Sequence, residues 1–220
     1  MFVNLIETMN HNSICPLCNS QGEEFFNSPK QTFYKCGNCE GIFLSKEQLP
    51  TTHQEKQRYE LHENNSDDSG YRAFVLPIVN SVLNDFNATH VGLDFGSGKD
   101  SSIVKMLREN NYNIIPYDPF FANDASLLTK KYDYIVCCEV MEHFHNPNKE
   151  FELLKRLLKP QGKLYCMTHI YSPDIDFEKW YYKNDPTHVF IYQNKTLEWI
   201  KNVFGFSEIK IEHRLITFTN

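Results

Sequence analysis

The sequence lacks long apolar runs, and it lacks an excess of positive charge. Its 220 residues contain no stretch of about 18 consecutive apolar side chains, so no membrane-spanning helix is expected. Residues 1–12 do not show the basic-then-apolar order of a secretory signal peptide. The net charge of −6 predicts no broad attraction to phosphate backbones or anionic membranes. These absences favour a cytoplasmic protein without a membrane partner.

The sequence also lacks an even number of cysteines, which argues against a framework held only by disulfides. It has seven, and four of them form two Cys-x-x-Cys pairs, Cys15 with Cys18 and Cys36 with Cys39, separated by residues 19–35. Two pairs at this spacing let four thiolates surround a zinc ion and leave no position open for catalysis. The pattern predicts a structural zinc ribbon, with redox pairs or disulfides as alternatives, and the other three cysteines are expected as buried thiols.

The region around these cysteines is acidic. Residues 1–70 contain five Lys or Arg against ten Asp or Glu, a balance that would repel a phosphate backbone. A scaffold or protein-contact role is therefore favoured over nucleic-acid binding, which is unlikely on charge but is not excluded.

A buried strand followed by a glycine turn stands near the middle of the chain. Residues 91–98 read Val-Gly-Leu-Asp-Phe-Gly-Ser-Gly, and their glycines allow the backbone to approach a ligand. A helix is expected over residues 101–109, which would place that ligand at a helix N-terminus. Ser101 stands where a dinucleotide fingerprint has its third small residue, and Asp100 replaces the hydroxyl of a phosphate-binding loop. A glycine turn after any buried strand remains the simpler explanation of this pattern alone.

An acidic residue ends the next predicted strand. That strand covers residues 112–117, and Asp118 follows it, 20 residues after Gly98. A carboxylate placed there can accept hydrogen bonds from two ribose hydroxyls. At this point the sequence resembles the class I S-adenosylmethionine-dependent methyltransferases, which pair a Leu-Asp-x-Gly-x-Gly loop with an acidic residue at the end of the next strand.

The resemblance implies a cofactor site and a fold. Asp94, Gly96, Ser97 and Gly98 would line the methionine end of S-adenosylmethionine, and Asp118 would hold its ribose. The fold would be α/β, a Rossmann-like sheet of the seven-stranded type, mostly parallel, with an antiparallel C-terminal hairpin. The expected divisions are a zinc ribbon over residues 1–45, a linker or cap over residues 46–69 and a methyltransferase domain over residues 70–220.

Apolar periodicity places the remaining elements. Only residues 119–132 separate Asp118 from the next buried strand, so the third strand of the fold is expected to be shortened to residues 126–128. The other expected elements are helices over residues 70–85, 147–159 and 194–204, and strands over residues 134–138, 163–168 and, as a hairpin, 206–219.

Two carboxylates and an imidazole follow the strand at residues 134–138. On a helical turn, Glu139, Glu142 and His143 would face one point. The set resembles the Glu-x-x-Glu-His element of some metal-dependent O-methyltransferases, including small-RNA 2′-O-methyltransferases and those of quinone biosynthesis. The resemblance implies a second, divalent metal that would lower the pKa of an acceptor hydroxyl. The alternative is a helix start that lines the cofactor pocket without a metal, and Glu139 is expected to contact the cofactor.

Residues 169–188 are rich in aromatic side chains that can build an acceptor pocket, and core packing is the rival explanation for them. Asp185-Pro-Thr-His188 resembles a segment of related methyltransferases in which the histidine turns into the active site. His188 would take a proton from a hydroxyl acceptor or complete the metal set, whereas a structural role is the alternative. Residues 59–65 resemble a segment that closes over the cofactor in zinc-bearing relatives, and a solvated connector is equally compatible with them.

The sequence therefore predicts an S-adenosylmethionine-dependent methyltransferase with a structural zinc ion and a small-molecule acceptor, such as a sugar or another hydroxyl compound. His188, Glu142 and His143 are its candidate catalytic residues. The alternatives are a metal-assisted O-methyltransferase acting on RNA, a zinc-ribbon adaptor with a vestigial cofactor pocket, and a nucleotide-binding oxidoreductase. The sequence leaves the methylated atom, the role of the ribbon and the oligomeric state open.

Overall fold

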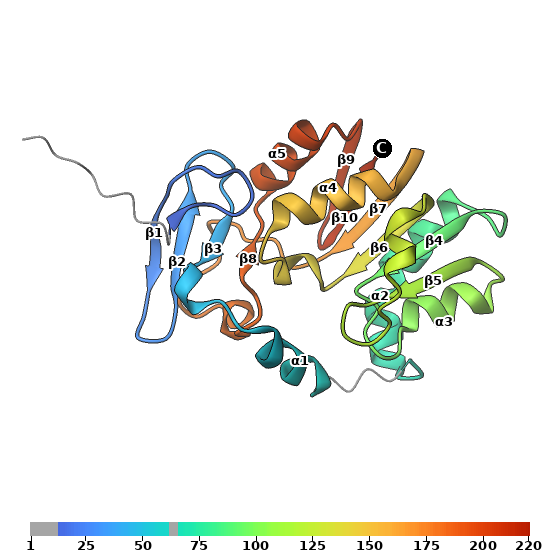
Figure 1. Ribbon diagram of the computed structural model, residues 1–220, viewed down its shortest axis with the longest axis horizontal. Coiled ribbons are helices and arrows are strands. Elements are labelled where there is room, and N and C mark those ends of the chain that lie inside the picture. Colours follow the sequence, from blue (N-terminus) through green and yellow to red (C-terminus); the bar gives the residue numbers. More distant parts are fainter. Residues whose placement is uncertain (1–12, 62–65) are drawn as a thin grey trace, which may run out of the picture.

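The computed structural model describes residues 13–61 and 66–220, and these form two sheets (Figure 1). The larger sheet has six strands in the order β5-β4-β6-β7-β10-β9. The four strands β5, β4, β6 and β7 are parallel, and β10 pairs antiparallel with both β7 and β9. Their bounds are β4 Val91–Phe95, β5 Asn113–Tyr117, β6 Tyr132–Cys138, β7 Leu158–Met167, β9 Glu208–Glu212 and β10 Leu215–Thr219. The predicted α/β sheet with an antiparallel C-terminal hairpin is confirmed.

Two pairs of helices cover the two faces of this sheet, because side chains alternate along its central strands. On β6, Ile135 and Cys137 belong to the apolar cluster that includes α4 and α5, whereas Tyr134 and Val136 belong to the cluster that includes α2 and α3. The helices are α2 Ser69–Asp85, α3 Ser102–Glu109, α4 Pro147–Leu157 and α5 Asn194–Phe204. All four agree with the periodicity of the sequence.

Local sequence signals fix the ends of these helices. The backbone N–H of Val104 donates to Ser101 Oγ at 3.2 Å, which caps α3, and Pro147 occupies the first turn of α4 behind its cap Asn146. Gly205 ends α5 with φ 71°, a left-handed conformation that glycine adopts without strain.

Two expected strands differ from the structure. Residues 126–128 form no strand; they lie in the 3₁₀ helix η3 (Ala125–Thr129), because the carboxylate of Asp124 accepts the Ser126 backbone N–H at 3.0 Å and starts a turn. The described residues therefore contain a six-stranded main sheet instead of the seven-stranded type. In addition, β7 begins at Leu158 rather than at residue 163, since the chain passes from α4 directly into the strand.

The cysteine region forms a second, antiparallel sheet of β1 (Gly22–Asn27), β2 (Thr32–Cys36) and β3 (Ile42–Leu44). Its fourth strand, β8 (Phe190–Ile191), comes from the C-terminal part of the chain and pairs with β3. The backbone N–H of Leu44 extends this pairing by donating to the carbonyl of Val189 at 2.9 Å. A buried apolar cluster that contains Phe33, Phe177 and Trp180 joins the small sheet to the segment before β8.

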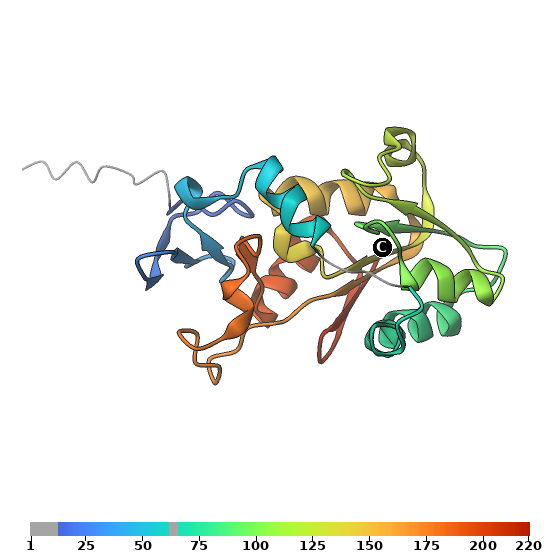
Figure 2. The same cartoon turned by 90° about the horizontal axis from the view of Figure 1, so that it is seen from below.

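Helix α1 (Thr52–Glu60) occupies the segment expected as a linker, and Figures 1 and 2 both show it between the small sheet and the end of the larger one. No residue of α1 is buried. Arg58 Nη2 lies 2.7 Å from Asp185 Oδ2, and Glu55 Oε1 lies 3.1 Å from His145 Nε2. These polar contacts, together with ring contacts of Tyr59 with Phe120 and His143, hold it in place. Residues 1–12 and 62–65, which include part of the predicted 59–65 segment, lie outside the described residues.

Candidate functional site

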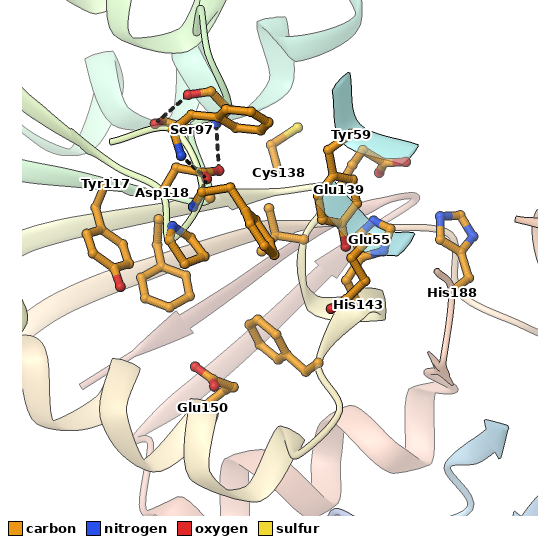
Figure 3. A pocket seen from close by; sticks show the side chains of 18 of the residues that line it. Glu55, Tyr59, Ser97, Tyr117, Asp118, Cys138, Glu139, His143, Glu150 and His188 are labelled. Carbon is orange, nitrogen blue, oxygen red and sulfur yellow. Dashed lines mark hydrogen bonds between the residues drawn. The ribbon is translucent and has the colours of Figure 1, made fainter. Parts of the chain in front are cut away.

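A cavity of about 970 Å³ opens at the carboxyl ends of β4, β5 and β6 (Figure 3). The carboxyl edge of a parallel sheet is where α/β folds bind ligands, because loops from neighbouring strands meet there. Helix α1, the glycine turn after β4, the loop after β5, the segment before α4 and residues from 169 to 188 form its walls. Its lining includes Tyr59, Phe95, Gly96, Ser97, Gly98, Tyr117, Asp118, Cys138, Glu139, His143, Glu150, His169, His188 and Arg214.

The glycine turn brings bare backbone to the cavity wall. Gly96 and Gly98 have φ values of 85° and 64°, which residues other than glycine rarely adopt. A Cβ atom on Gly96 would lie 2.4 Å from Val140 Cγ2, so the position has no space for a side chain. Two hydrogen bonds to the end of β5 fix the turn: the N–H groups of Gly96 and Ser97 donate to the carbonyl of Tyr117 at 2.8 and 3.0 Å.

Asp118 lies at the tip of β5, as the sequence predicts, and its carboxylate organises the surrounding backbone. Oδ2 accepts the Gly98 N–H at 3.0 Å, and Oδ1 accepts the N–H groups of Phe120 and Phe121 at 2.8 and 3.1 Å. A carboxylate has about four acceptor positions, so one remains, on Oδ2. The structure therefore leaves that position on Oδ2 for a ribose hydroxyl.

Asp94 does not line the large cavity, contrary to the expectation for the methionine end. It lies beneath the glycine turn, where Ser101 Oγ donates to its Oδ2 at 2.6 Å, and it borders a much smaller adjoining cavity. Burial raises the pKa of Asp94 to about 7, opposed by the Ser101 hydrogen bond. The position of Asp94 is thus one that supports the turn and the start of α3.

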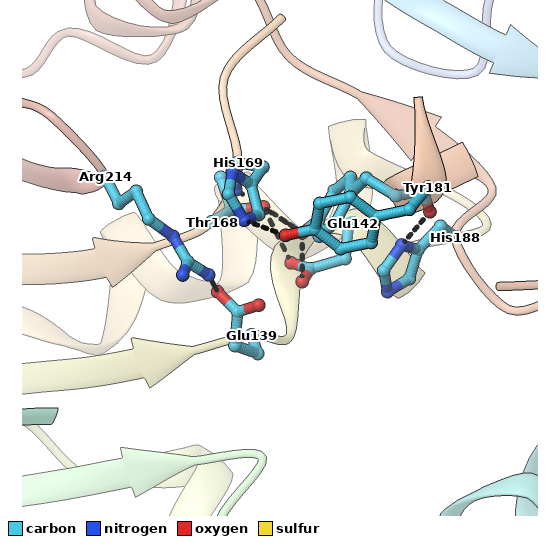
Figure 4. A network of polar contacts seen from close by, with 8 residues as sticks. Glu139, Glu142, Thr168, His169, Tyr181, His188 and Arg214 are labelled. Carbon is cyan, nitrogen blue, oxygen red and sulfur yellow. Dashed lines mark hydrogen bonds and ion pairs between the residues drawn. The ribbon is translucent and has the colours of Figure 1, made fainter. Parts of the chain in front are cut away.

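Glu139 is separated from the residues with which it was grouped. The helical turn contains only Met141–His143, as the 3₁₀ helix η4, and Glu139 precedes it with φ 52°. Its Oε1 instead accepts from Arg214 Nη2 at 2.7 Å (Figure 4). Burial raises the pKa of Glu139 to about 8, and the Arg214 guanidinium offsets part of that shift. The expectation that Glu139, Glu142 and His143 face one point is therefore wrong, because the turn of the backbone at residue 139 redirects the first carboxylate.

Glu142 is fully buried beside the cavity. Its two oxygens accept hydrogen bonds from the hydroxyls of Tyr182, at 2.6 Å, and Thr168, at 3.1 Å. Burial raises the pKa of the carboxyl even with these donors present. Glu142 therefore connects η4 to the end of β7 and to the aromatic residues that follow it.

Two histidines lie next to this carboxylate. His143 Nδ1 is 2.8 Å from the carbonyl oxygen of Thr187, and His188 Nδ1 is 2.7 Å from that of Tyr182. A carbonyl only accepts, so each neutral ring carries its proton on Nδ1 and its lone pair on Nε2. One candidate ligand atom from each of Glu142, His143 and His188 lies within 4.8 Å of the others. Burial lowers the pKa of His188, which favours the neutral ring.

Sequence reasoning missed several charged residues at or beside the cavity, three of which bear on the site. Arg214, in the turn between β9 and β10, and Glu150, on α4, both line it. Arg58 holds Asp185, and although burial alone would raise the pKa of Asp185, hydrogen bonds from Arg58 and Thr187 keep it below its usual range. A lone charged residue carries no spacing signal, so none of the three could be recognised from its neighbours in sequence.

The four paired cysteines form a cluster away from the cavity. The Sγ atoms of Cys15 and Cys39 are 3.5 Å apart, those of Cys18 and Cys36 are 3.3 Å apart, and all four lie within 4.8 Å of one another. A disulfide would need about 2 Å, whereas thiolates around a tetrahedral zinc ion are separated by roughly 3.8 Å. Of the other three, Cys137 and Cys166 are buried as expected, but Cys138 is half-buried on the cavity wall.

Comparison with known families agrees with this architecture. A family model described as a methyltransferase domain matches residues 68–211, more than half of the chain. The chain belongs to this methyltransferase family. A ubiquinone biosynthesis O-methyltransferase from Actinobacillus pleuropneumoniae is 28% identical to it over 95 residues, which are 41% of this chain and 41% of that protein. The match thus covers about two fifths of the length of this curated relative.

Solved structures show the same fold for this methyltransferase. An O-methyltransferase family protein from Burkholderia thailandensis gives a TM-score of 0.54 at 12% identity, over 79% of this chain and 64% of that one. An S-adenosylmethionine-dependent methyltransferase from Archaeoglobus fulgidus gives 0.52 at 23% identity, over 64% and 72%. The predicted family and fold are confirmed. Among residues 13–61 and 66–220, no helix combines the length and apolarity needed to cross a membrane.

Proposed function

We propose that this methyltransferase transfers a methyl group from S-adenosylmethionine to a hydroxyl group of a small molecule. The observation that carries the proposal is that one cavity joins the glycine turn and Asp118 to the pair His143 and His188. Its volume of about 970 Å³ is at the upper end of the range for small-molecule sites, roughly 300–1,000 Å³, which suits two ligands side by side. The ubiquinone biosynthesis relative, an O-methyltransferase by name, supports oxygen as the acceptor atom.

The residues of the cavity fit the three parts of the cofactor. Asp118 would bind a ribose hydroxyl through the acceptor position that remains on Oδ2. Arg214 and Glu139 form an ion pair on the cavity wall, and their charges complement the carboxylate and ammonium of the methionine part. The glycine turn gives the cofactor close access to the backbone between them. When bound, S-adenosylmethionine supplies a methyl group on a positively charged sulfur.

His188 would act as the general base toward the acceptor. Its Nδ1–H is fixed on a backbone carbonyl, so its Nε2 lone pair can accept the proton of a hydroxyl group. As that proton leaves, the acceptor oxygen bonds to the methyl carbon and the carbon–sulfur bond breaks, with its electron pair going to sulfur. The protein contributes mainly by aligning the acceptor oxygen with the methyl group, and this alignment accounts for a large share of the rate enhancement of methyl transfer.

A divalent metal at Glu142, His143 and His188 is a second candidate for activation of the acceptor. The observation that favours it is that both histidines donate Nδ1–H to backbone carbonyls, the orientation that metal-ligating histidines usually have. Glu142 already accepts two hydrogen bonds, and Glu139 is held by Arg214 instead of completing the set. The donors present thus fit a three-ligand site in place of the predicted four. Transfer to RNA is less favoured, since the chain has a net charge of −6.

We also propose that the four clustered cysteines hold a structural zinc ion. The Sγ separations support this, and the backbone N–H of Asn38 donates to Cys36 Sγ at 3.4 Å, a contact that stabilises a thiolate. Four sulfur ligands fill a tetrahedral zinc site, so the ion would stabilise the small sheet without taking part in catalysis.

Calorimetry with S-adenosylhomocysteine tests the proposed function directly. The wild-type chain should bind it. Asp118→Ala should weaken binding at least about tenfold, since it removes the charged acceptor of a hydrogen bond from the ligand. Asp174→Ala, which removes an exposed carboxylate outside the cavity, should bind like wild type. The melting temperature of each variant shows whether it is folded. Absence of heat with both S-adenosylmethionine and S-adenosylhomocysteine in the wild type would overturn the proposal.

A further inference from the structure

One end of the cavity is apolar and aromatic, and the proposed methyl transfer assigns no role to its side chains. Tyr117 stacks on Phe95 with ring centroids 5.4 Å apart, and Phe144 meets Phe95 edge-on at 6.3 Å. Leu128 from η3 and Leu153 from α4 also line the cavity, and they pack against the apolar cluster that contains these three rings. Flat apolar walls of this kind suit a planar heteroaromatic ring.

Glu150 is a carboxylate at this apolar end. It extends from α4 toward the cavity (Figure 3). It is near enough to Tyr117 to add to the effect of burial in raising the pKa of that phenol. Within the described part of the chain its carboxyl makes no hydrogen bond or ion pair, and burial alone raises its pKa. Because this carboxylate is half-buried at the cavity wall and has no protein partner among the described residues, it can accept a hydrogen bond from a ligand that enters the apolar end.

We propose that Glu150 is a specificity-determining residue that accepts a hydrogen bond from the exocyclic amino group of the cofactor's adenine. This inference rests on the proposed function. Asp118 directly follows Tyr117, so a ribose held by Asp118 lies at the border of the apolar end. The ion pair of Glu139 and Arg214 matches the charged amino acid part, which leaves the apolar end for the base. Adenine has a single exocyclic donor on an otherwise aromatic ring, and a carboxylate oxygen is its natural acceptor.

The experiment compares two ligands with three variants by calorimetry. The ligands are S-adenosylhomocysteine and its 6-deamino analogue, in which hydrogen replaces the amino group. Glu150→Leu replaces the carboxylate with an apolar side chain of similar size and so removes the acceptor. Glu150→Gln replaces the carboxylate with an amide, whose oxygen can still accept a hydrogen bond. Glu152→Leu changes an exposed carboxylate of the same helix and serves as the control.

We expect wild type and Glu152→Leu to bind the deamino analogue about tenfold more weakly than S-adenosylhomocysteine, which corresponds to about 1.4 kcal/mol. Glu150→Leu should bind both ligands with similar affinity, near that of the wild type for the analogue. Glu150→Gln should keep at least half of the discrimination on a logarithmic scale. Because Glu150 is half-buried and its carboxyl makes no hydrogen bond or ion pair within the described residues, Glu150→Leu should leave the melting temperature unchanged or higher.

Two results separate this inference from the proposed function. If the wild type binds S-adenosylhomocysteine but does not discriminate against the analogue, or if Glu150→Leu still discriminates, the role of Glu150 is wrong and the proposed function stands. If the wild type binds neither ligand, the proposed function itself fails.

Discussion

Removing one buried hydroxyl, by Tyr182→Phe, tests how Glu142 is held. Tyr182 Oη donates to Glu142 Oε1 at 2.6 Å, and the whole ring is buried. Phenylalanine fills nearly the same space, so the substitution removes the donor without opening a large cavity. Glu142 would retain the longer hydrogen bond from Thr168, at 3.1 Å.

The expected loss follows from the charge of the acceptor. A hydrogen bond to an ionised group contributes about 1.5–3 kcal/mol, so Tyr182→Phe should lower the free energy of unfolding by about 2 kcal/mol. For a chain of this length that corresponds to a decrease of roughly 4–8 °C in Tm. The neighbouring Tyr181 is a matched control, because its hydroxyl contacts His169 Nε2 at 2.6 Å while the side chain is 65% exposed. Tyr181→Phe should therefore change stability by less than about 0.5 kcal/mol.

The pH dependence gives this prediction a second observable. Burial raises the pKa of Glu142 in the folded chain, so its contribution to stability is fully present below the ordinary glutamate pKa, about 4.3, and is lost as the pH rises through the folded value. The Tyr182 hydroxyl favours the ionised form and limits that loss. The difference between Tyr182→Phe and wild type should thus be largest at neutral pH and should shrink as the carboxyl becomes protonated.

Urea unfolding at a series of pH values from about 4 to 8 measures both effects. A Tyr182→Phe variant as stable as Tyr181→Phe at neutral pH would refute the reasoning. So would a stability difference that does not change with pH, because it would show that Glu142 is not the group that loses its partner.

Three further predictions concern the base, helix α1 and the cysteines. If His188 is the base, the rate of methyl transfer should fall as the pH decreases, with a midpoint below about 6.5, because burial lowers the pKa of His188. His188→Gln should lower kcat about 10²–10⁴-fold and abolish this pH dependence, and an unchanged pH profile would contradict the role of His188 as the base. Arg58→Ala should cost under about 1 kcal/mol of global stability but should speed amide hydrogen exchange across α1, whereas unchanged exchange would show that its ion pair with Asp185 does not hold the helix. Metal analysis should find about one zinc per wild-type chain, far less in Cys36→Ser and the wild-type amount in Cys138→Ser. Equal zinc contents in the two variants would show that the four cysteines do not bind the ion.

The central part of the fold could be predicted because its determinants are local. An apolar strand, two glycines and the capping residue Ser101 lie within a short stretch, and each acts on its immediate neighbours. The position of Asp118 followed from its spacing to Gly98, since neighbouring parallel strands end at the same edge. The two cysteine pairs were equally informative, because their spacing predicted that the four thiols come together, and their Sγ atoms lie within 4.8 Å of one another.

The remaining features depend on contacts between distant residues. The direction of Glu139 is set by its positive φ and by Arg214, 75 residues later, and neither leaves a pattern near residue 139. Helix α1 has no buried residue and shows no apolar periodicity, so its segment was expected as a linker or cap. The third strand was expected at residues 126–128 because the family's fold has one between Asp118 and the next buried strand, whereas the cap at Asp124 determined the local structure.

Strand β8 limits how this chain can be divided. Its two residues complete the small sheet, yet His188, close before it, lies on the cavity wall. A shortened protein that starts after β3 would expose the edge of β8 and the aromatic side chains beside it, and self-association would be the expected outcome. Exchange of acceptor preference between relatives would therefore require the N-terminal sheet and residues 169–192 to be transplanted together, as one module assembled from both ends of the chain.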